Sequence, residues 1–165
     1  LNTDGIMNFS EAQHDMVRLG IGMYGITSSK KNQNKLEPVF TWQTKISQIK
    51  KIKKGDVVGY SKEFVADKQM TIAIIPVGYA DGFRRVLKNG AGGVFINSKF
   101  CKTLGNICMD MTMVDVSDLN VKEGDSVEII GKNQSIYSMA LSMNTIPYEI
   151  LTGISKRVHR IYIDE

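Results

Sequence analysis

Two similar short stretches, Ile52-Lys53-Lys54-Gly55-Asp56-Val57-Val58 and Val121-Lys122-Glu123-Gly124-Asp125-Ser126-Val127, give the clearest indication of the fold class. Both copies contain Lys-x-Gly-Asp-x-Val, and Gly-Asp between apolar runs is typical of a tight turn between strands. A true internal repeat is the other interpretation, but preferred turn chemistry is the simpler one. Many short strands joined by such turns predict a mainly β fold, an antiparallel β-barrel or sandwich.

Alternating apolar residues predict the remaining strands of this β-domain, which we place at residues 37–165. Period-2 alternation predicts strands at 39–52 and 158–163, and a dense apolar run predicts one at 70–77. Further strands are expected at 57–60, 93–96, 107–116 and 127–130. Helical spacing occurs at 135–143, through Ile136, Met139, Ala140 and Met143.

Residues 1–27 have a different character. Ser10 to Gln13 predicts a short helix or turn, and residues 16–25 form a nearly continuous run of apolar residues and glycine. Such a run is typical of a buried parallel strand. Its single charge, Arg18, would need buried partners and is expected to face a site. Residues 28–35 hold no hydrophobic side chain, so we predict a linker at 28–36.

Composition excludes several classes of protein. The chain has 165 residues, 42% hydrophobic and 23% charged, with a formal net charge of +4, which is ordinary for a globular protein and low for a dedicated nucleic-acid binder. We expect no membrane span, no secretion signal and a cytoplasmic location. Two cysteines and two distant histidines predict neither a disulfide framework nor a metal site, and no phosphate-loop or dinucleotide motif occurs.

Five lysines lie between Lys45 and Lys54. A sheet edge protected by lysines is the simpler interpretation. Binding of a polyanion such as RNA is the alternative, although no aromatic residues are interleaved with the lysines.

Two tyrosines follow glycines at expected strand ends, in Gly59-Tyr60 and Gly78-Tyr79. A phenol at such a loop edge can point into a cleft and exchange protons when a cation lies nearby. A core or interface role is the alternative for either tyrosine.

Several motifs together resemble the alanine racemase family. They are Asp-Met-Val-Arg-Leu-Gly-Ile-Gly-Met-Tyr-Gly at 15–25, Gly-Asp-Val-Val-Gly-Tyr at 55–60, Pro-Val-Gly-Tyr-Ala-Asp-Gly at 76–82, Gly-Asn-Ile-Cys-Met-Asp-Met at 105–111, Pro-Tyr-Glu-Ile at 147–150 and Arg-Val-His-Arg at 157–160. The resemblance implies an enzyme that uses pyridoxal 5'-phosphate and has an N-terminal (β/α)₈ barrel and a C-terminal β-domain. Residues 1–27 would then be a remnant of the barrel, its last strands, and residues 37–165 the β-domain.

The resemblance implies a cofactor-binding set in this chain. Gly20 and Ile21 match positions whose backbone N–H groups hold the cofactor phosphate, and Tyr148 matches a phosphate-binding tyrosine. Thr3 stands where the family usually has serine. Arg18 matches the arginine that faces the pyridine nitrogen, and a guanidinium there would keep that nitrogen neutral.

The resemblance also implies the catalytic and substrate residues. Tyr60 matches the tyrosine that exchanges the Cα proton of L-alanine, with Gly59 where the family more often has serine. Tyr79, Met109 and Asp110 match the substrate-binding region.

The implied protein is a homodimer with shared active sites that supplies D-alanine for bacterial peptidoglycan. The family's Schiff-base lysine would lie upstream of Leu1, so we expect the isolated chain to be inactive. A non-catalytic β-barrel binding module that uses the Lys45–Lys54 run, or a racemase for serine, remains the alternative.

Overall fold

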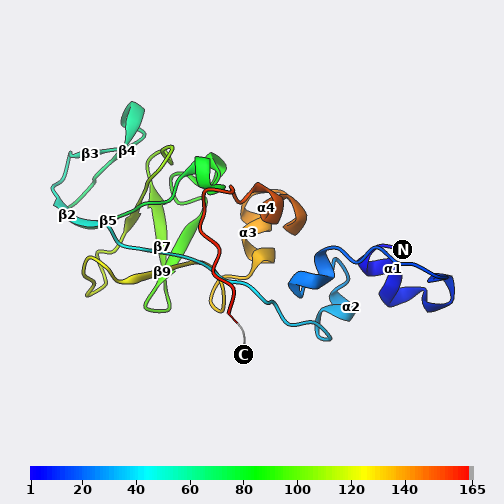
Figure 1. Cartoon of the computed structure of the whole chain (residues 1–165). Coiled ribbons are helices and arrows are strands. Elements are labelled where there is room, and N and C mark those ends of the chain that lie inside the picture. The colour runs from blue at the N-terminus through cyan, green and yellow to red at the C-terminus, as the bar shows by residue number, and fades with distance from the viewer. Residues whose placement is uncertain (164–165) are drawn as a thin grey trace. The chain divides into compact units, whose positions relative to one another are not determined.

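The computed structural model describes residues 1–163, which fall into two compact units, Leu1–Phe40 and the chain from Thr41 onward (Figure 1). The first unit is built from short helices: α1 (Thr3–Asn8), the 3₁₀-helices η1 (Ser10–Ala12) and η2 (Ile21–Tyr24), and α2 (Lys30–Gln33). Helix α1 begins at Asn2, whose side-chain oxygen accepts the Gly5 N–H at 3.0 Å. The short helix expected near Ser10 is confirmed as η1.

The strand expected at residues 16–25 is absent from the first unit, all of which the structure describes. Arg18 N donates to Leu1 O at 2.7 Å, but no ladder of hydrogen bonds extends from this contact, and η2 occupies the end of the segment. A strand exists only when a neighbouring strand accepts and donates along its length. Residues 1–40 contain no strand with which the apolar run at 16–25 could pair.

The polar segment at 28–36 is part of the first unit. It contains α2, and the buried Asn32 donates from Nδ2 to Asn8 Oδ1 at 3.0 Å. The Ser28 hydroxyl donates to the carboxylate of Asp4 in α1. The boundary between the two units follows Phe40, C-terminal to the linker that we predicted.

The second unit is a seven-stranded sheet in which every paired strand is antiparallel to its neighbour. The strand order is β1-β9-β6-β7-β8-β5-β2, and a small hairpin, β3-β4, stands apart from it (Figure 1). The strands are β1 (Trp42–Lys45), β2 (Gln48–Ile52), β3 (Val57–Val58), β4 (Phe64–Val65), β5 (Met70–Ile75), β6 (Gly93–Ile96), β7 (Lys99–Leu104), β8 (Thr112–Asp115) and β9 (Ser126–Ile130).

The sheet curls until its two edges meet. Strands β1 and β2 lie at opposite edges of the sheet, yet only Ile46 and Ser47 separate them in the chain. Ile46 N donates to Asp125 O, just before β9, at 3.0 Å and Ser47 N donates to Ile74 O of β5 at 2.9 Å, so the connection is bonded to segments at both sides of the sheet. The prediction of a mainly β, nearly closed antiparallel fold is confirmed.

The two Lys-x-Gly-Asp turns adopt the same geometry. Asp56 Oδ2 accepts the Lys53 N–H at 2.7 Å, and Asp125 Oδ2 accepts the Lys122 N–H at 2.9 Å. The glycines between them, Gly55 and Gly124, have φ of +91° and +90°, a conformation that favours glycine. The turn interpretation of these stretches is therefore confirmed.

Other elements differ from the prediction. The expected strand at 107–116 is a strand only over β8, and residues 158–163 form no strand, with the side chains of Ile161, Tyr162 and Ile163 exposed. Helix α3 (Ile136–Ser142) is confirmed and begins at the Ser135 cap, whereas α4 (Pro147–Gly153) and β7 were not foreseen. Buried core residues of the second unit include Phe83, Val94, Val114, Val127, Ile129 and Met139, and a separate cluster joins Ile72 to Ile52, Val58, Ala66, Met70, Leu104 and Met113.

Candidate functional site

Tyr60 opens a single 3₁₀ turn, η3 (Tyr60–Lys62), between β3 and β4. The chain reaches this turn through Gly59, whose φ is +75°, and leaves it through Ser61 and Lys62, which also have positive φ. The Tyr60 side chain is 74% exposed. A phenol so little covered by the rest of the chain is available to a ligand or to another protein surface.

An open groove of about 570 Å³ lies beside Tyr60. Most of its wall is apolar, from β2, β3, β5 and β8, and it is lined by Ile52, Val58, Ile72, Ile74, Met111 and Met113, with Lys50, Asp56 and Cys108 supplying polar groups. An apolar cleft with a few polar groups is typical of a small-molecule site or a protein contact.

Tyr79 and Met109 are brought together by backbone hydrogen bonds. Tyr79, at the start of η4 (Tyr79–Asp81), donates its N–H to Cys108 O at 3.0 Å, and Ala80 N donates to Met109 O at 3.1 Å. Gly78 makes this approach possible, because a Cβ at that position would lie 2.3 Å from both carbonyl oxygens. Two of the three expected substrate residues therefore share one junction.

Asp110 joins this junction through an arginine that we did not single out from the sequence. Arg157 donates from Nε to Asp81 Oδ1 at 2.7 Å and from a terminal nitrogen to Asp110 Oδ1 at 2.5 Å. The hydrogen bonds to Asp81 and then Asp110 raise the pKa of the Arg157 guanidinium above its ordinary value. The motif at 157–160 was the only sequence signal for Arg157.

Thr3, Gly20 and Ile21 lie together in the first unit. The buried Thr3 hydroxyl accepts the N–H groups of Gly20 at 3.3 Å and Gly22 at 3.0 Å. Both lone pairs of the oxygen are then engaged, so its hydrogen is what remains for a ligand. A Cβ added at Gly20 would meet no atom within 4 Å, so a ligand can approach the backbone of this residue closely.

Arg18 is exposed in the first unit, so the expectation of a buried, partnered arginine is wrong for this chain. Its neighbours Met16 and Leu19 are exposed as well, Met16 by 76%. No element of residues 1–40 covers this apolar face, which is why the arginine found no buried surroundings. Arg18 nevertheless lies two residues from Gly20 in the chain.

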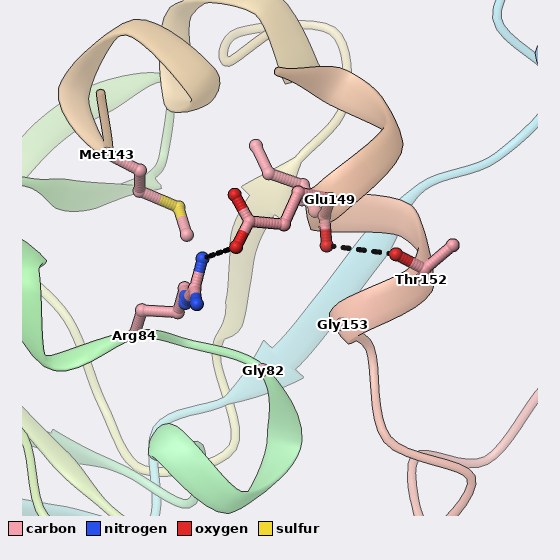
Figure 2. Close-up of a pocket in the computed structure, with 7 residues that line it drawn as sticks. Gly82, Arg84, Met143, Glu149, Thr152 and Gly153 are labelled. Atoms are coloured by element: carbon pink, nitrogen blue, oxygen red, sulfur yellow. Dashed lines mark hydrogen bonds and ion pairs between the residues drawn. The ribbon is translucent and has the colours of Figure 1, made fainter. Parts of the chain in front are cut away.

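Tyr148 lies on α4 of the second unit and is partly exposed. Its carbonyl accepts the Thr152 hydroxyl at 2.8 Å. Beside it, a pocket of about 180 Å³ is lined by Gly82, Arg84, Met143, Glu149, Ile150, Thr152 and Gly153. Figure 2 shows Arg84 and Glu149 paired within this pocket. The Thr145 hydroxyl and Arg84 hold the pKa of the Glu149 carboxyl below its ordinary value.

Within residues 1–163, no cluster of three or more histidine, cysteine, aspartate or glutamate side chains could hold a metal ion. Helices of the length and apolar character that crossing a membrane requires are likewise not found in this described part. Cys101 and Cys108 are both free thiols.

Comparison with known proteins decides the family. A family model described as the C-terminal domain of alanine racemase matches residues 39–162. The chain belongs to the alanine racemase family. Alanine racemase 1 of Clostridium acetobutylicum is 39% identical over 170 residues, and the alanine racemase of Fusobacterium nucleatum is 41% identical over 166 residues; each match covers 98% of this chain.

Solved alanine racemases have the same fold. The Bartonella henselae enzyme, with covalently bound pyridoxal phosphate, is 38% identical with a TM-score of 0.88, and the match covers 98% of this chain and 45% of that one. The Bacillus anthracis enzyme, with bound L-Ala-P, is 33% identical with a TM-score of 0.91, over 99% and 44%. The chain thus spans less than half of these relatives, and 44% and 46% of the Clostridium and Fusobacterium proteins.

Proposed function

We propose that the protein containing this chain interconverts L-alanine and D-alanine with pyridoxal 5'-phosphate, and supplies D-alanine for bacterial peptidoglycan. The observation that carries the proposal is the exposed Tyr60 phenol at the edge of a groove, in a chain similar along 98% of its length to alanine racemases. This chain would contribute the C-terminal part of that enzyme.

The residues of the first unit fit the phosphate of this cofactor. A phosphate accepts hydrogen bonds. The Thr3 hydroxyl, whose oxygen already accepts the Gly20 and Gly22 N–H groups, keeps its hydrogen for such a ligand, and the missing side chain at Gly20 leaves room for it to approach. Tyr148, in the second unit, matches a phosphate-binding tyrosine of the family and is proposed for that role. Arg18, which cannot accept a proton, would lie against the pyridine nitrogen and keep it unprotonated. When bound, the cofactor withdraws electrons from the substrate Cα and makes its proton acidic.

Tyr60 would hold and release the proton at one face of the substrate Cα. Racemisation needs an acid–base group on each face, and in this proposal the second group is a lysine outside this chain. A phenol with little cover from its own fold is suited to reach into a neighbouring surface, so we infer a homodimer in which Tyr60 completes the site of the other subunit.

Tyr79, Met109 and Asp110 would bind the substrate and line its entrance. Their common junction is held by the close approach at Gly78 and by the Arg157 bridge to Asp81 and Asp110. The apolar groove wall beside Tyr60 offers contacts for an apolar substrate side chain such as the methyl group of alanine.

RNA binding has less support. Lys50 and Lys51 lie on β2, an edge strand of the sheet, where lysines protect against pairing with other strands. Two free thiols fit a reducing compartment, and we infer that the enzyme acts in the cytoplasm.

The direct test is to assay the full-length protein with L-alanine and with L-serine, before and after removal of the cofactor. Racemisation of L-alanine that is lost with the cofactor and returns when it is added supports the proposal. Turnover of L-serine but not of L-alanine would favour the alternative substrate. No turnover of either would refute a racemase function.

A further inference from the structure

The Tyr60 turn depends on support from elsewhere in the fold. The exposed 3₁₀ turn consists of residues 60–62. Two of them, Ser61 and Lys62, have φ of +62° and +54°. Such left-handed conformations cost free energy in residues other than glycine and persist when surrounding contacts hold them. The contact that holds the Tyr60 backbone is therefore of functional interest.

That contact comes from Asn106. Its side-chain Nδ2 donates to Tyr60 O at 3.1 Å, across 46 residues of sequence, while its Oδ1 accepts from a terminal nitrogen of Arg85 at 3.3 Å. Arg85 can only donate, so the amide oxygen must face Arg85 and the amide nitrogen must face Tyr60. Arg85 thereby fixes the orientation in which Asn106 supports the tyrosine.

Asn106 is itself rigidly placed. It is only 3% exposed, and Gly105 before it lies against the strand that leads to Tyr60, since a Cβ on Gly105 would be 2.6 Å from Val58 O. Both polar atoms of this buried amide have a hydrogen-bond partner, and flipping the amide would turn its oxygen toward Tyr60 O and its nitrogen toward the Arg85 donor, so the observed orientation is favoured.

The same chain segment holds the substrate side of the candidate site. Two and three residues after Asn106, the carbonyls of Cys108 and Met109 accept the N–H groups of Tyr79 and Ala80. A single stretch, residues 105–110, therefore contacts the Tyr60 turn at one end and the Tyr79–Met109 junction at the other.

We propose that Asn106 is a positioning residue, which sets the place of the Tyr60 phenol relative to Tyr79 and Met109 through its hydrogen bond to the Tyr60 carbonyl. This inference rests on the function proposed above. Asn106 reaches the reacting atoms only through Tyr60, so its loss shifts the phenol without removing a group that binds substrate.

Asn106→Asp in the full-length holoenzyme tests the proposal. The carboxylate still accepts from Arg85, but it has no donor for Tyr60 O. We expect the backbone amides of residues 60–63 to exchange with deuterium roughly tenfold faster, and kcat with L-alanine to fall roughly tenfold while KM changes little. Asn97→Asp is the matched control: the same chemical change in the exposed β6–β7 turn, where neither quantity changes.

A double-mutant cycle separates positioning from general damage. If Asn106 acts through Tyr60, Asn106→Asp slows an enzyme that already carries Tyr60→Phe by no more than about twofold. Equal slowing in both backgrounds, or unchanged amide exchange at residues 60–63, overturns the proposal. If Tyr60→Phe alone leaves the rate unchanged, the proposed function fails instead, and amide exchange still reports the Asn106 contact.

Arg85→Met provides a second variant that does not depend on burying a new charge. Arg85 is exposed, so its loss leaves the core intact but frees the orientation of the Asn106 amide. We expect exchange at residues 60–63 to rise two- to threefold, in the same direction as in Asn106→Asp. Unchanged exchange would contradict the role given to Arg85 and Asn106.

Discussion

Arg157 Nε donates to Asp81 Oδ1 at 2.7 Å, across 76 residues of sequence. Asp81 is 8% exposed, and its other carboxylate oxygen accepts the Gly78 N–H at 2.9 Å. A terminal nitrogen of the same guanidinium donates to Asp110 Oδ1, so Arg157 links the η4 turn to the segment that contains Met109. The side chain of Arg157 itself is 45% exposed, which makes the bridge a device for placing residues more than a source of stability.

Replacing Arg157 in the full-length protein tests this placement. We expect Arg157→Met to raise KM for alanine roughly tenfold, because Asp110 and Met109 lose their common anchor. Arg157→Lys is the conservative control, and it should recover only part of the effect, because an ammonium cannot reproduce the planar fork that serves two carboxylates. Steady-state kinetics with L-alanine measure both variants; an unchanged KM in Arg157→Met would contradict the placement.

Gly78→Ala should destabilise the second unit. The added methyl would lie 2.3 Å from Cys108 O and Met109 O, which are backbone atoms that cannot move aside cheaply. We expect the free energy of unfolding to fall by about 1–3 kcal/mol, measured by urea denaturation of the chain. Gly153→Ala is the control, since a Cβ there meets nothing within 4 Å; a similar loss in both variants would argue against the close approach.

Thr3→Val should weaken binding of pyridoxal 5'-phosphate to the full-length protein. Valine matches the shape of threonine but leaves the Gly20 and Gly22 N–H groups without the hydroxyl oxygen and offers no donor to a phosphate. We expect the Kd to rise roughly tenfold or more, measured by titration of cofactor fluorescence. Thr3→Ser keeps the hydroxyl and should bind as the parent does. Equal Kd values for Thr3→Val and the parent would remove Thr3 from the phosphate site.

Cys101 predicts a specific loss of stability at high pH. Burial raises the pKa of its thiol from 9.0 to about 11 in the folded chain. Between these values the unfolded chain releases the proton while the folded chain keeps it, so stability falls as pH rises from about 9 to 11 and is unaffected below 9. The fall attributable to this thiol is at most about 3 kcal/mol.

Comparison with Cys101→Ala isolates this effect from other groups that titrate at high pH. The variant lacks the thiol, so its stability should approach that of the parent as the pH rises from 9 to 11. Urea denaturation at pH 8, 9, 10 and 11 measures the difference. A difference that stays constant across this range would contradict the role of the thiol.

The local chemistry of turns and caps was predictable from sequence. Gly55-Asp56 and Gly124-Asp125 form matching turns because the aspartate side chain closes the loop on a nearby N–H and needs no help from distant residues. Ser135 caps α3 for the same reason. Strands β5 and β6 followed from dense apolar runs.

Pairing between distant segments was not predictable in the same way. Residues 158–163 alternate as a strand would, but their apolar side chains are exposed and find no strand to pair with in the second unit. Strand β7 was not predicted because Lys99 and Lys102 interrupt its apolar pattern. The Asn97-Ser98 pair before it was a usable turn signal in the sequence, and both residues have positive φ in the structure. Pro147 at the first turn of α4 was another.

The candidate site was partly predictable for a related reason. Tyr60 and Tyr79 stood out because each follows a glycine at the end of an apolar run, and both lie at such loop edges. The Asn106–Tyr60 and Arg157–Asp81 contacts depend on how the curled sheet brings distant segments together, and no local sequence pattern predicts this. The roles of Asn106 and Arg157 could be inferred only from the three-dimensional structure.

In the proposed reaction Tyr60 moves the Cα proton on the L-alanine side, and the Tyr60→Phe variant of the full-length protein isolates this step. The measurement is exchange of the alanine Cα hydrogen with deuterated solvent, started separately from L-alanine and from D-alanine. We predict that exchange from L-alanine is essentially abolished, while exchange of the D-alanine hydrogen persists. Equal, undiminished exchange from both enantiomers would exclude Tyr60 as the group that moves this proton.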